Sequence, residues 1–325
     1  MKFRVHAAAA FAALASLASG MSLAAEAAYP VRPVRIVIGF PPAGGVDSLS
    51  RALAPKLGEA TGQTWVVENR PGAAGNIGAE IAARATPDGY TTLMVLNTQL
   101  TVNPSLYRMN FSVEKDFAPV MKIVRAEHIL VVHPTVPAKS FKEFIAYARQ
   151  KPKSLNYASA GVGSSLHIAA ELLKKRAGID MVHVAYKGAG PAVAALVSAE
   201  AQVLTGTVSS TTSFISAGRL RALASLGSKR SKVLPDLPTV AESGYPGFEA
   251  DAWYGMLVPA GTPPAIIARI RSEILKAMQH PEVQSTLARQ GLSEETSTPA
   301  ELGALIKSES ATYAALIKET GIKAE

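Results

Sequence analysis

A glycine-rich segment between a short strand and a helix is the feature that most constrains the fold of this chain. Residues 34–38 form a β-branched run that predicts a buried strand, and the residues from Ser48 onward have the apolar spacing of an amphipathic helix. Between them, Gly44 and Gly45 allow the backbone to turn, and Asp47 or Ser48 can cap the helix. The free amides of the first helical turn can then bind an anion without a charged side chain. The glycine spacings of the Rossmann and P-loop motifs are absent.

The N-terminus indicates export. Lys2 and Arg4 precede an apolar run at 7–18 that is too short to span a bilayer, and residues 25–27 have the small-x-small pattern of a cleavage site. We therefore expect residues 1–27 to be a secretory signal peptide. The mature protein is expected to be free in the periplasm and not inserted in a membrane.

The composition excludes several classes of function. The chain has no cysteine, which rules out disulfides, a lipoprotein anchor and thiolate chemistry. Its net charge is +8, but the basic residues are spread along the chain without interleaved aromatics, so we expect no nucleic-acid binding. A modest positive field still favours small anionic ligands. The histidines lack the spacing of metal ligands, and we expect neither a metal nor a cofactor.

Strand and helix patterns alternate along the chain, which predicts an α/β fold. Strands at 65–67 and 92–96 enclose a helix at 77–85, and with the first strand and helix they complete a β-α-β-α-β unit with a parallel sheet. Asn97 and Thr98 follow the last of these strands. They should stand at the carboxyl edge of the sheet, where open α/β sheets place their ligands.

A second unit repeats this arrangement. A strand at 155–158 runs into the small-residue loop 159–165 and a helix at 166–176. Residues 205–212 are expected to be a hydroxyl-rich loop that follows another strand. Two glycine-rich loops that face each other across a cleft can hold one ligand from both sides.

Extended apolar segments connect the two units. The runs 120–124 and 129–132 are candidates for a crossing between domains, and residues 251–258 are a candidate for the return. A chain that leaves one domain, builds a second and returns has two linkers and a hinge. We expect domains with these limits: 28–126 together with 250–325, and 127–249.

Nine short motifs, in this order, make up a specific pattern: 39–47, 68–78, 87–90, 103–107, 116–120, 156–164 with His167, 186–191, 234–239 and 259–263. With these motifs and the predicted signal peptide, the sequence resembles the Bug family, the periplasmic solute-binding receptors of tripartite tricarboxylate transporters. The likeness covers nearly the whole mature chain. It implies a type II periplasmic binding fold, in which two α/β domains joined by crossing hinge strands close like a flytrap on a carboxylate.

The resemblance also implies where the ligand lies. One carboxylate is expected at loop 159–164, with ordered waters bridging to loop 40–45. Together with the positions at strand ends, it gives these expected ligand-binding residues: Phe40, Pro41, Gly44, Gly45, Asn97, Thr98, Ser159, Ala160, Gly163, Ser164, Tyr186, Thr205, Thr207 and Asp251. For Asp251 a hinge role is an alternative. Asp47 is expected to interact with its helix start, and His167 to be a packing or hydrogen-bonding residue.

Three departures from the family pattern bear on the ligand. Ala43 stands where the family usually has glycine, and Val46 where it often has a hydroxyl, so the first loop is expected to be tighter and drier. Residues 204–206 are Leu-Thr-Gly where the family usually has approximately Met-Phe-Asp. The loss of an aromatic ring and an acid should enlarge the pocket and remove a partner for a ligand ammonium. We therefore expect a di- or aromatic carboxylate rather than an amino acid.

The expected function is capture of this carboxylate by a monomeric receptor, which delivers it to the membrane subunits of the transporter. A receptor that acts on a membrane signalling partner is an alternative, and an exported hydrolase or transferase is another. The sequence has no Gly-x-Ser-x-Gly elbow, no cysteine and no histidine in a recognisable triad context, so we expect no enzyme.

Overall fold

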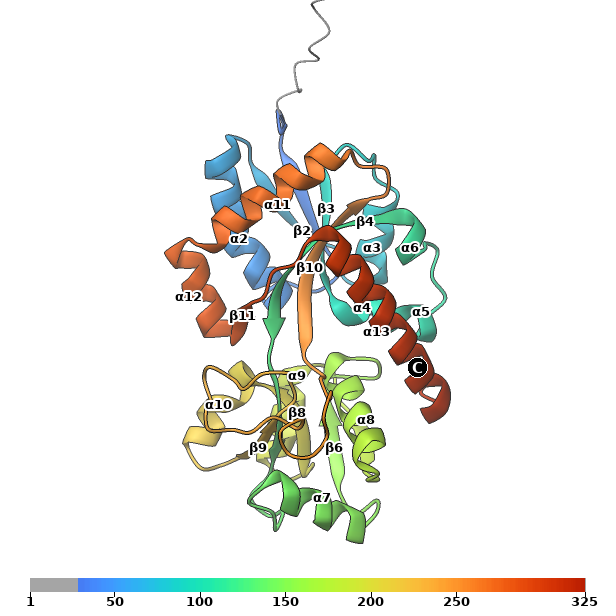
Figure 1. The fold of residues 1–325 in the computed structure, drawn as a ribbon, viewed down its shortest axis with the longest axis vertical. Helices are drawn as coiled ribbons and strands as arrows, with labels where there is room; N and C mark the ends of the chain where they lie inside the picture. Colours follow the sequence, from blue (N-terminus) through green and yellow to red (C-terminus); the bar gives the residue numbers. More distant parts are fainter. Residues whose placement is uncertain (1–28, 325) are drawn as a thin grey trace, which may run out of the picture.

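The structure is a computed structural model that describes residues 29–324, so the predicted signal peptide lies outside the described residues. Two α/β domains lie one above the other, each built around its own sheet, and extended strands run between them (Figure 1). Among the described residues, no helix is long and apolar enough to cross a membrane.

The first domain contains a six-stranded mixed sheet in the order β11-β4-β10-β3-β1-β2. β1 pairs in parallel with β2 and β3, as the alternating pattern predicted, and β10 pairs antiparallel with β3 and β4. The strands are β1 (Val34–Ile38), β2 (Trp65–Asn69), β3 (Thr91–Leu96), β4 (Phe117–Ala126), β10 (Ala252–Pro259) and β11 (Leu292–Glu294).

Helices cover both faces of this sheet. Ile36 of β1 points into a core with α2, α11 and α12, whereas Val37 points into a core with α3, α4 and α13, as the two-residue period of a strand requires. The helices are α2 (Gly45–Thr61), the 3₁₀ turn η1 (Ala73–Gly75), α3 (Asn76–Ala83), α4 (Asn97–Thr101), α5 (Asn103–Leu106), α6 (Val113–Asp116), α11 (Pro264–Met278), α12 (Pro281–Gln290) and α13 (Pro299–Thr320).

The second domain contains a five-stranded sheet in the order β7-β6-β8-β5-β9, in which β6 pairs in parallel with β7 and β8. Helices α7 and α8 pack on one face, and α9 and α10 on the other. The elements are β5 (His128–Val132), α7 (Phe141–Gln150), β6 (Asn156–Ser159), α8 (Ser165–Ala177), β7 (Val182–Ala185), α9 (Ala189–Val197), β8 (Val203–Thr207), α10 (Val208–Ser216) and β9 (Arg221–Ser225).

The predicted hydroxyl-rich loop at 205–212 is wrong, because these residues form the end of β8 and the start of α10. Thr207 caps the helix by accepting the amide of Ser210 at 3.4 Å. The hydroxyls of Thr211 and Thr212 donate to carbonyls one turn earlier, at 2.8 and 2.6 Å. Hydroxyl side chains that bond in this way are satisfied inside a helix and do not need a loop.

The predicted cap of the first helix also differs. The N-cap of α2 is Gly44, which makes no side-chain cap bond, and Asp47 lies in the first turn. The strand predicted at 34–38 and the glycine-rich turn after it are where the sequence places them, whereas the strand predicted at 65–67 extends to Asn69 as β2. Helix α4, which starts directly after β3 at Asn97, was not predicted.

A buried ion pair joins the strands that cross between the domains. Arg125 at the end of β4 donates to Asp251, just before β10, at 2.7 Å, and Asp251 also accepts the amide of His128 at 2.7 Å. Gly227 leaves room for this pair, since a Cβ there would lie 2.2 Å from Asp251 Oδ2 and 2.6 Å from Arg125 Nη1. Asp251 is thus part of the hinge. The domain limits given above stay a prediction.

Gly227→Ala is expected to destabilise the protein by about 2 kcal/mol, because the new methyl group would overlap the buried ion pair and force Asp251 and Arg125 apart. The free energy of unfolding from urea titration measures this. Gly190→Ala in α9 is the matched control, since a Cβ there meets nothing within 4 Å. Equal stabilities of the two variants would contradict this description of the hinge.

Candidate ligand-binding site

The first glycine-rich loop joins β1 to α2 and contains four predicted ligand residues: Phe40, Pro41, Gly44 and Gly45. The buried side chain of Asp47 fixes this loop through hydrogen bonds. Its carboxylate accepts the amide of Ala43 at 2.9 Å, Nε of Arg51 at 3.0 Å and Nδ2 of Asn69 at 2.9 Å. Burial opposes ionisation, but these hydrogen bonds outweigh it and hold the pKa of Asp47 below its usual value. Asp47 therefore shapes the loop.

Tyr254 reaches this loop from β10 and was missed by the sequence reasoning. A Cβ on Gly45 would lie 2.5 Å from the Tyr254 hydroxyl oxygen, so the hydroxyl lies at the start of α2. Burial raises the pKa of Tyr254 to about 12, and the hydroxyl therefore keeps its proton. Among the described residues this hydroxyl has no hydrogen-bond partner, so it can donate to a ligand. No local sequence pattern marks it, because it lies on a strand distant from the loop in sequence.

Asn97 and Thr98 form the first turn of α4 and meet the second domain. They line a narrow space of about 10 Å³ together with Ser165 of α8 and Asp251. Asn97 Nδ2 donates to Glu309 at 3.3 Å, while its buried Oδ1 has no partner among the described residues. The structure thus brings Asn97 and Thr98, which the sequence placed at the carboxyl edge of the sheet, next to Asp251, which the sequence placed on the return strand.

The second glycine-rich loop joins β6 to α8 and contains Ser159, Ala160, Gly163 and Ser164. Ser164 is the N-cap of α8 and accepts the amide of His167 at 3.3 Å. The amide of Gly163 donates to Nδ1 of His167 at 3.1 Å, so it is used within the loop. The Ser159 hydroxyl is also used, because it bonds the amide of Gly161 at 3.1 Å.

The first turn of α8 therefore supplies the free donors at this loop. Helix geometry leaves the amides of Ser165 and Leu166 without an intrahelical acceptor. In the part of the chain that the structure describes, neither amide has another partner. These two amides lie at the start of α8, at the carboxyl edge of the second sheet. The positive end of the helix dipole at this place attracts an anion.

Three aromatic rings pack beneath the second loop. The rings of His167 and His183 stack with centroids 3.9 Å apart, and Tyr157 stacks on His183 at 4.8 Å. The hydroxyl of Tyr157 bonds Glu171, which also accepts Nζ of Lys174 at 2.8 Å. Burial, followed by the charges of His183 and Lys174, lowers the pKa of His167 to about 3.

The remaining predicted residues lie along the second sheet. Thr205 is fully buried, and its hydroxyl donates to the carbonyl of Leu166, which fixes α8 on β8. Thr207 caps α10. Tyr186 follows β7, is partly exposed, and has a pKa raised by burial and by Glu200. The side chains of Ser159, Thr205 and Asp251 are thus already bonded inside the protein, and their contacts with a ligand stay predictions.

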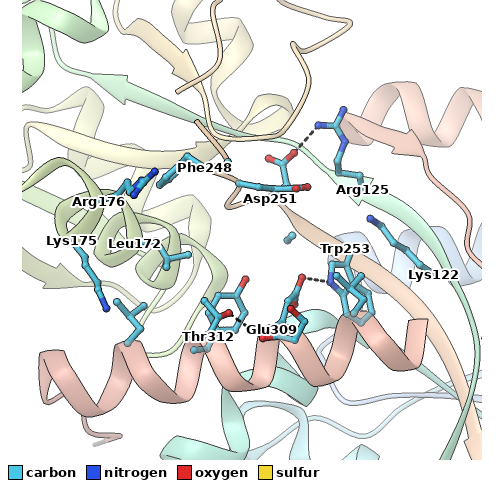
Figure 2. A pocket seen from close by; sticks show the side chains of 17 residues that line it. Lys122, Arg125, Leu172, Lys175, Arg176, Phe248, Asp251, Trp253, Glu309 and Thr312 are labelled. Carbon is cyan, nitrogen blue, oxygen red and sulfur yellow. Dashed lines mark hydrogen bonds and ion pairs between the residues drawn. The ribbon is translucent and has the colours of Figure 1, made fainter. Parts of the chain in front are cut away.

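A separate cavity of about 400 Å³ lies behind the hinge, between α13 and α8 (Figure 2). Asp251 is the predicted site residue that lines it, beside Arg125. Glu309 accepts Trp253 Nε1 at 2.8 Å on its wall. Burial raises the pKa of Asp251 to about 7 and that of Glu309 to about 6, although hydrogen bonds oppose both shifts. Among the described residues, neither glycine-rich loop lines this cavity.

The buried state of His167 predicts a pH-dependent contribution to stability. Its folded pKa lies below the unfolded value of 6.5, so the stability that neutral His167 contributes is present above pH 6.5 and is lost as the pH falls towards 3. A His167→Asn variant does not titrate at this position. Its stability deficit relative to the wild-type protein should shrink by about 2 kcal/mol between pH 7.5 and pH 5.

Urea unfolding of both proteins across this pH range measures the effect. Buried His128 is present in both proteins, so its own pH-dependent contribution cancels from the difference in stability. A deficit that stays constant with pH would show that His167 is not held neutral by its surroundings, which are His183, Tyr157, Glu171 and Lys174.

Known proteins share this fold. Residues 49–322 match the tripartite tricarboxylate transporter family receptor. BugT of Bordetella pertussis is 35% identical over 300 residues, which cover 91% of this chain and 91% of BugT. The structure of R. palustris Rpa4515 with adipate has a TM-score of 0.78 and 31% identity, and the match covers 91% of this chain and 99% of that one.

The structure of MatC from Rhodopseudomonas palustris with bound malate has a TM-score of 0.74 and 28% identity, over 89% of this chain and 100% of that one. These similarities confirm the resemblance to the Bug proteins and the predicted two-domain periplasmic binding fold. The chain belongs to the family of tripartite tricarboxylate transporter receptors.

Proposed function

We propose that this protein captures a di- or aromatic carboxylate between its two glycine-rich loops and delivers it to the membrane subunits of a tripartite tricarboxylate transporter. It acts in the periplasm as a monomer, after removal of residues 1–27, and catalyses no reaction. The two domains, 28–126 with 250–325 and 127–249, close over the ligand.

The single observation that carries this proposal is the pair of free amides at the start of α8. Ser165 and Leu166 offer two fixed N–H donors, and Ser165 faces Asn97 and Thr98 across the narrow space between the domains. A carboxylate accepts such donors readily, and waters can complete its shell. The free hydroxyl of Tyr254 at the first loop adds a donor on the opposite side.

The ligands of similar proteins support the chemical class. Rpa4515 was solved with adipate and MatC with malate, which are both dicarboxylates. In this chain the segment 204–206 has no acid that could pair with a ligand ammonium, and the Thr205 hydroxyl is bonded to Leu166. This composition favours a plain carboxylate over an amino acid.

Contacts between the domains beside the loops support closure as the mechanism. A Cβ on Gly163 would lie 2.7 Å from Leu106 of α5, and Ile168 of α8 packs with Val102 and Tyr313 of the first domain. A ligand drives closure only if it binds the closed state more tightly than the open one. A carboxylate held by both loops meets this condition, because each domain contributes donors.

A thermal-shift screen of the mature protein tests the function, with hits confirmed by calorimetry. Dicarboxylates such as adipate and malate, or an aromatic acid, should raise the melting temperature, while sugars and amino acids leave it unchanged. The protein is unfolded and refolded first to remove any ligand that co-purifies. No shift with any carboxylate would contradict the proposed function.

Ser164→Trp is expected to abolish carboxylate binding, because an indole would cover the start of α8. The lost helix cap costs about 1 kcal/mol of stability in addition. Ser140→Trp is the matched control, since Ser140 caps α7 in the same way by accepting the amide of Glu143. Calorimetry should find wild-type affinity in the control. Wild-type affinity in Ser164→Trp as well would show that the ligand lies elsewhere.

Tyr254→Phe should weaken carboxylate binding about tenfold with little change in stability, since the hydroxyl bonds no described residue and a hydrogen bond to a charged group contributes about 1.5 kcal/mol. Tyr147→Phe on α7 is the control. An unchanged dissociation constant would remove Tyr254 from the site.

A further inference from the structure

The cavity behind the hinge has walls from both domains (Figure 2). On one side it is lined by β4, β10 and α13, and on the other by α8 and the segment 247–249. Its volume of about 400 Å³ is that of a small-molecule binding site. A molecule in this hinge cavity would therefore contact both domains where the chain crosses between them.

Aromatic and aliphatic side chains form much of the wall. Three rings and four aliphatic side chains line the cavity: Phe248, Trp253, Tyr313, Leu172, Ala252, Leu305 and Leu316. Aromatic rings pack against the apolar body of a ligand and attract a cation through their faces. The hydroxyl of Tyr313 has no hydrogen-bond partner among the described residues, so its oxygen can accept a hydrogen bond from a ligand.

Most of the cations that line the cavity are already paired with acids. Three of the four form ion pairs: Lys122 with Glu295, Arg125 with Asp251, and Lys175 with Glu319. The fourth, Arg176, is exposed and donates to the carbonyl of Pro246 at 2.9 Å. In the part of the chain that the structure describes, two lining acids, Glu249 and Glu309, form no ion pair. The unpaired charges are therefore two acids and one cation at the surface.

Glu309 is the unpaired acid on the inner wall. Its carboxylate accepts Nε1 of Trp253 at 2.8 Å and Nδ2 of Asn97 at 3.3 Å, which are both neutral donors. Figure 2 shows Glu309 on α13 beside Trp253, whereas Arg176 lies on α8 at the other side of the cavity. Burial raises the pKa of Glu309 to about 6, so the carboxyl is ionised at pH 8. A carboxylate that is mostly removed from water and has no counter-ion favours a cationic partner.

We propose that the hinge cavity is a second binding site, which takes a small organic amine. The ammonium group pairs with Glu309, and the aromatic or aliphatic body packs against Trp253, Phe248 and Leu172. An amino acid does not fit, because its own carboxylate would lie beside Glu309 and be repelled. This site goes beyond the proposed function and does not depend on it, since the amine and the carboxylate occupy different places.

Two probes of nearly equal shape isolate the charge: 2-phenylethylamine and 2-phenylethanol. Calorimetry on the mature protein at pH 8 should find that the amine binds about tenfold more tightly than the alcohol. Glu309→Gln should remove this preference, although its amide oxygen still accepts Trp253 Nε1. Glu114→Gln on α6 is the matched control, since Glu114 is exposed and does not line the cavity. Equal amine affinities of Glu309→Gln and the wild-type protein would overturn the pairing.

A second pair of variants tests the location. Thr312→Trp places an indole at the exposed edge of the cavity and should weaken amine binding about tenfold or more. Ala314→Trp is the control, because Ala314 is exposed on α13 and does not line the cavity. Ser164→Trp should also bind the amine like the wild-type protein.

No amine binding by the wild-type protein, or wild-type affinity in Thr312→Trp, would overturn the proposed amine site. A protein that binds the amine but no carboxylate would instead contradict the proposed function alone, so the two failures are distinguishable.

Discussion

The free amides at the start of α8 are the feature on which the proposed binding site depends. An anion that leaves water needs fixed donors, and a helix start supplies them without a cationic side chain. Here Ser165 and Leu166 provide these donors because the first turn of a helix has no intrahelical acceptor for them, whereas the amides of Gly163 and Ser164 are bonded within the loop. The β6 strand leads into this loop, and the stacked rings of Tyr157, His183 and His167 lie beneath it.

The same strand, loop and helix arrangement occurs in both domains, but the hinge makes them one receptor. Arg125 and Asp251 pair where the chain crosses, and Gly227 packs against this pair with no room for a side chain. Helix α13 of the first domain contacts α8 of the second through Tyr313, Leu316 and Ile168. A movement of the hinge therefore changes the distance between the two helix starts, which would couple domain closure to the ligand binding that we propose.

Much of the fold could be predicted from the sequence, because regular patterns are local. The run 34–38 is β1, and the glycines after it form the predicted turn. Helix α4 was missed because Asn97, Thr98, Gln99 and Thr101 are buried polar residues that show no apolar period. The hydroxyl-rich sequence of α10 predicts a loop, but the hydroxyls of Ser210, Thr211 and Thr212 donate to carbonyls of the preceding turn and are satisfied within the helix. The hydrophobic pattern of a sequence does not show hydrogen bonds of this kind.

The site could be predicted only as a set of loops. Sequence position indicated that Asn97 and the 159–164 loop lie at sheet edges, which the structure agrees with. Sequence position could not show that the hydroxyls of Ser159 and Thr205 form hydrogen bonds within the second domain. It also could not show that Tyr254 lies against Gly45, or that the His167 ring stacks on His183. These contacts join residues on different elements.

The most direct test of the proposed binding site is an NMR titration of the ¹⁵N-labelled mature protein with adipate or malate. The amide resonances of Ser165 and Leu166 should shift and saturate with the ligand, and the largest shifts at the hinge cavity around Arg125, with none at α8, would contradict the central claim.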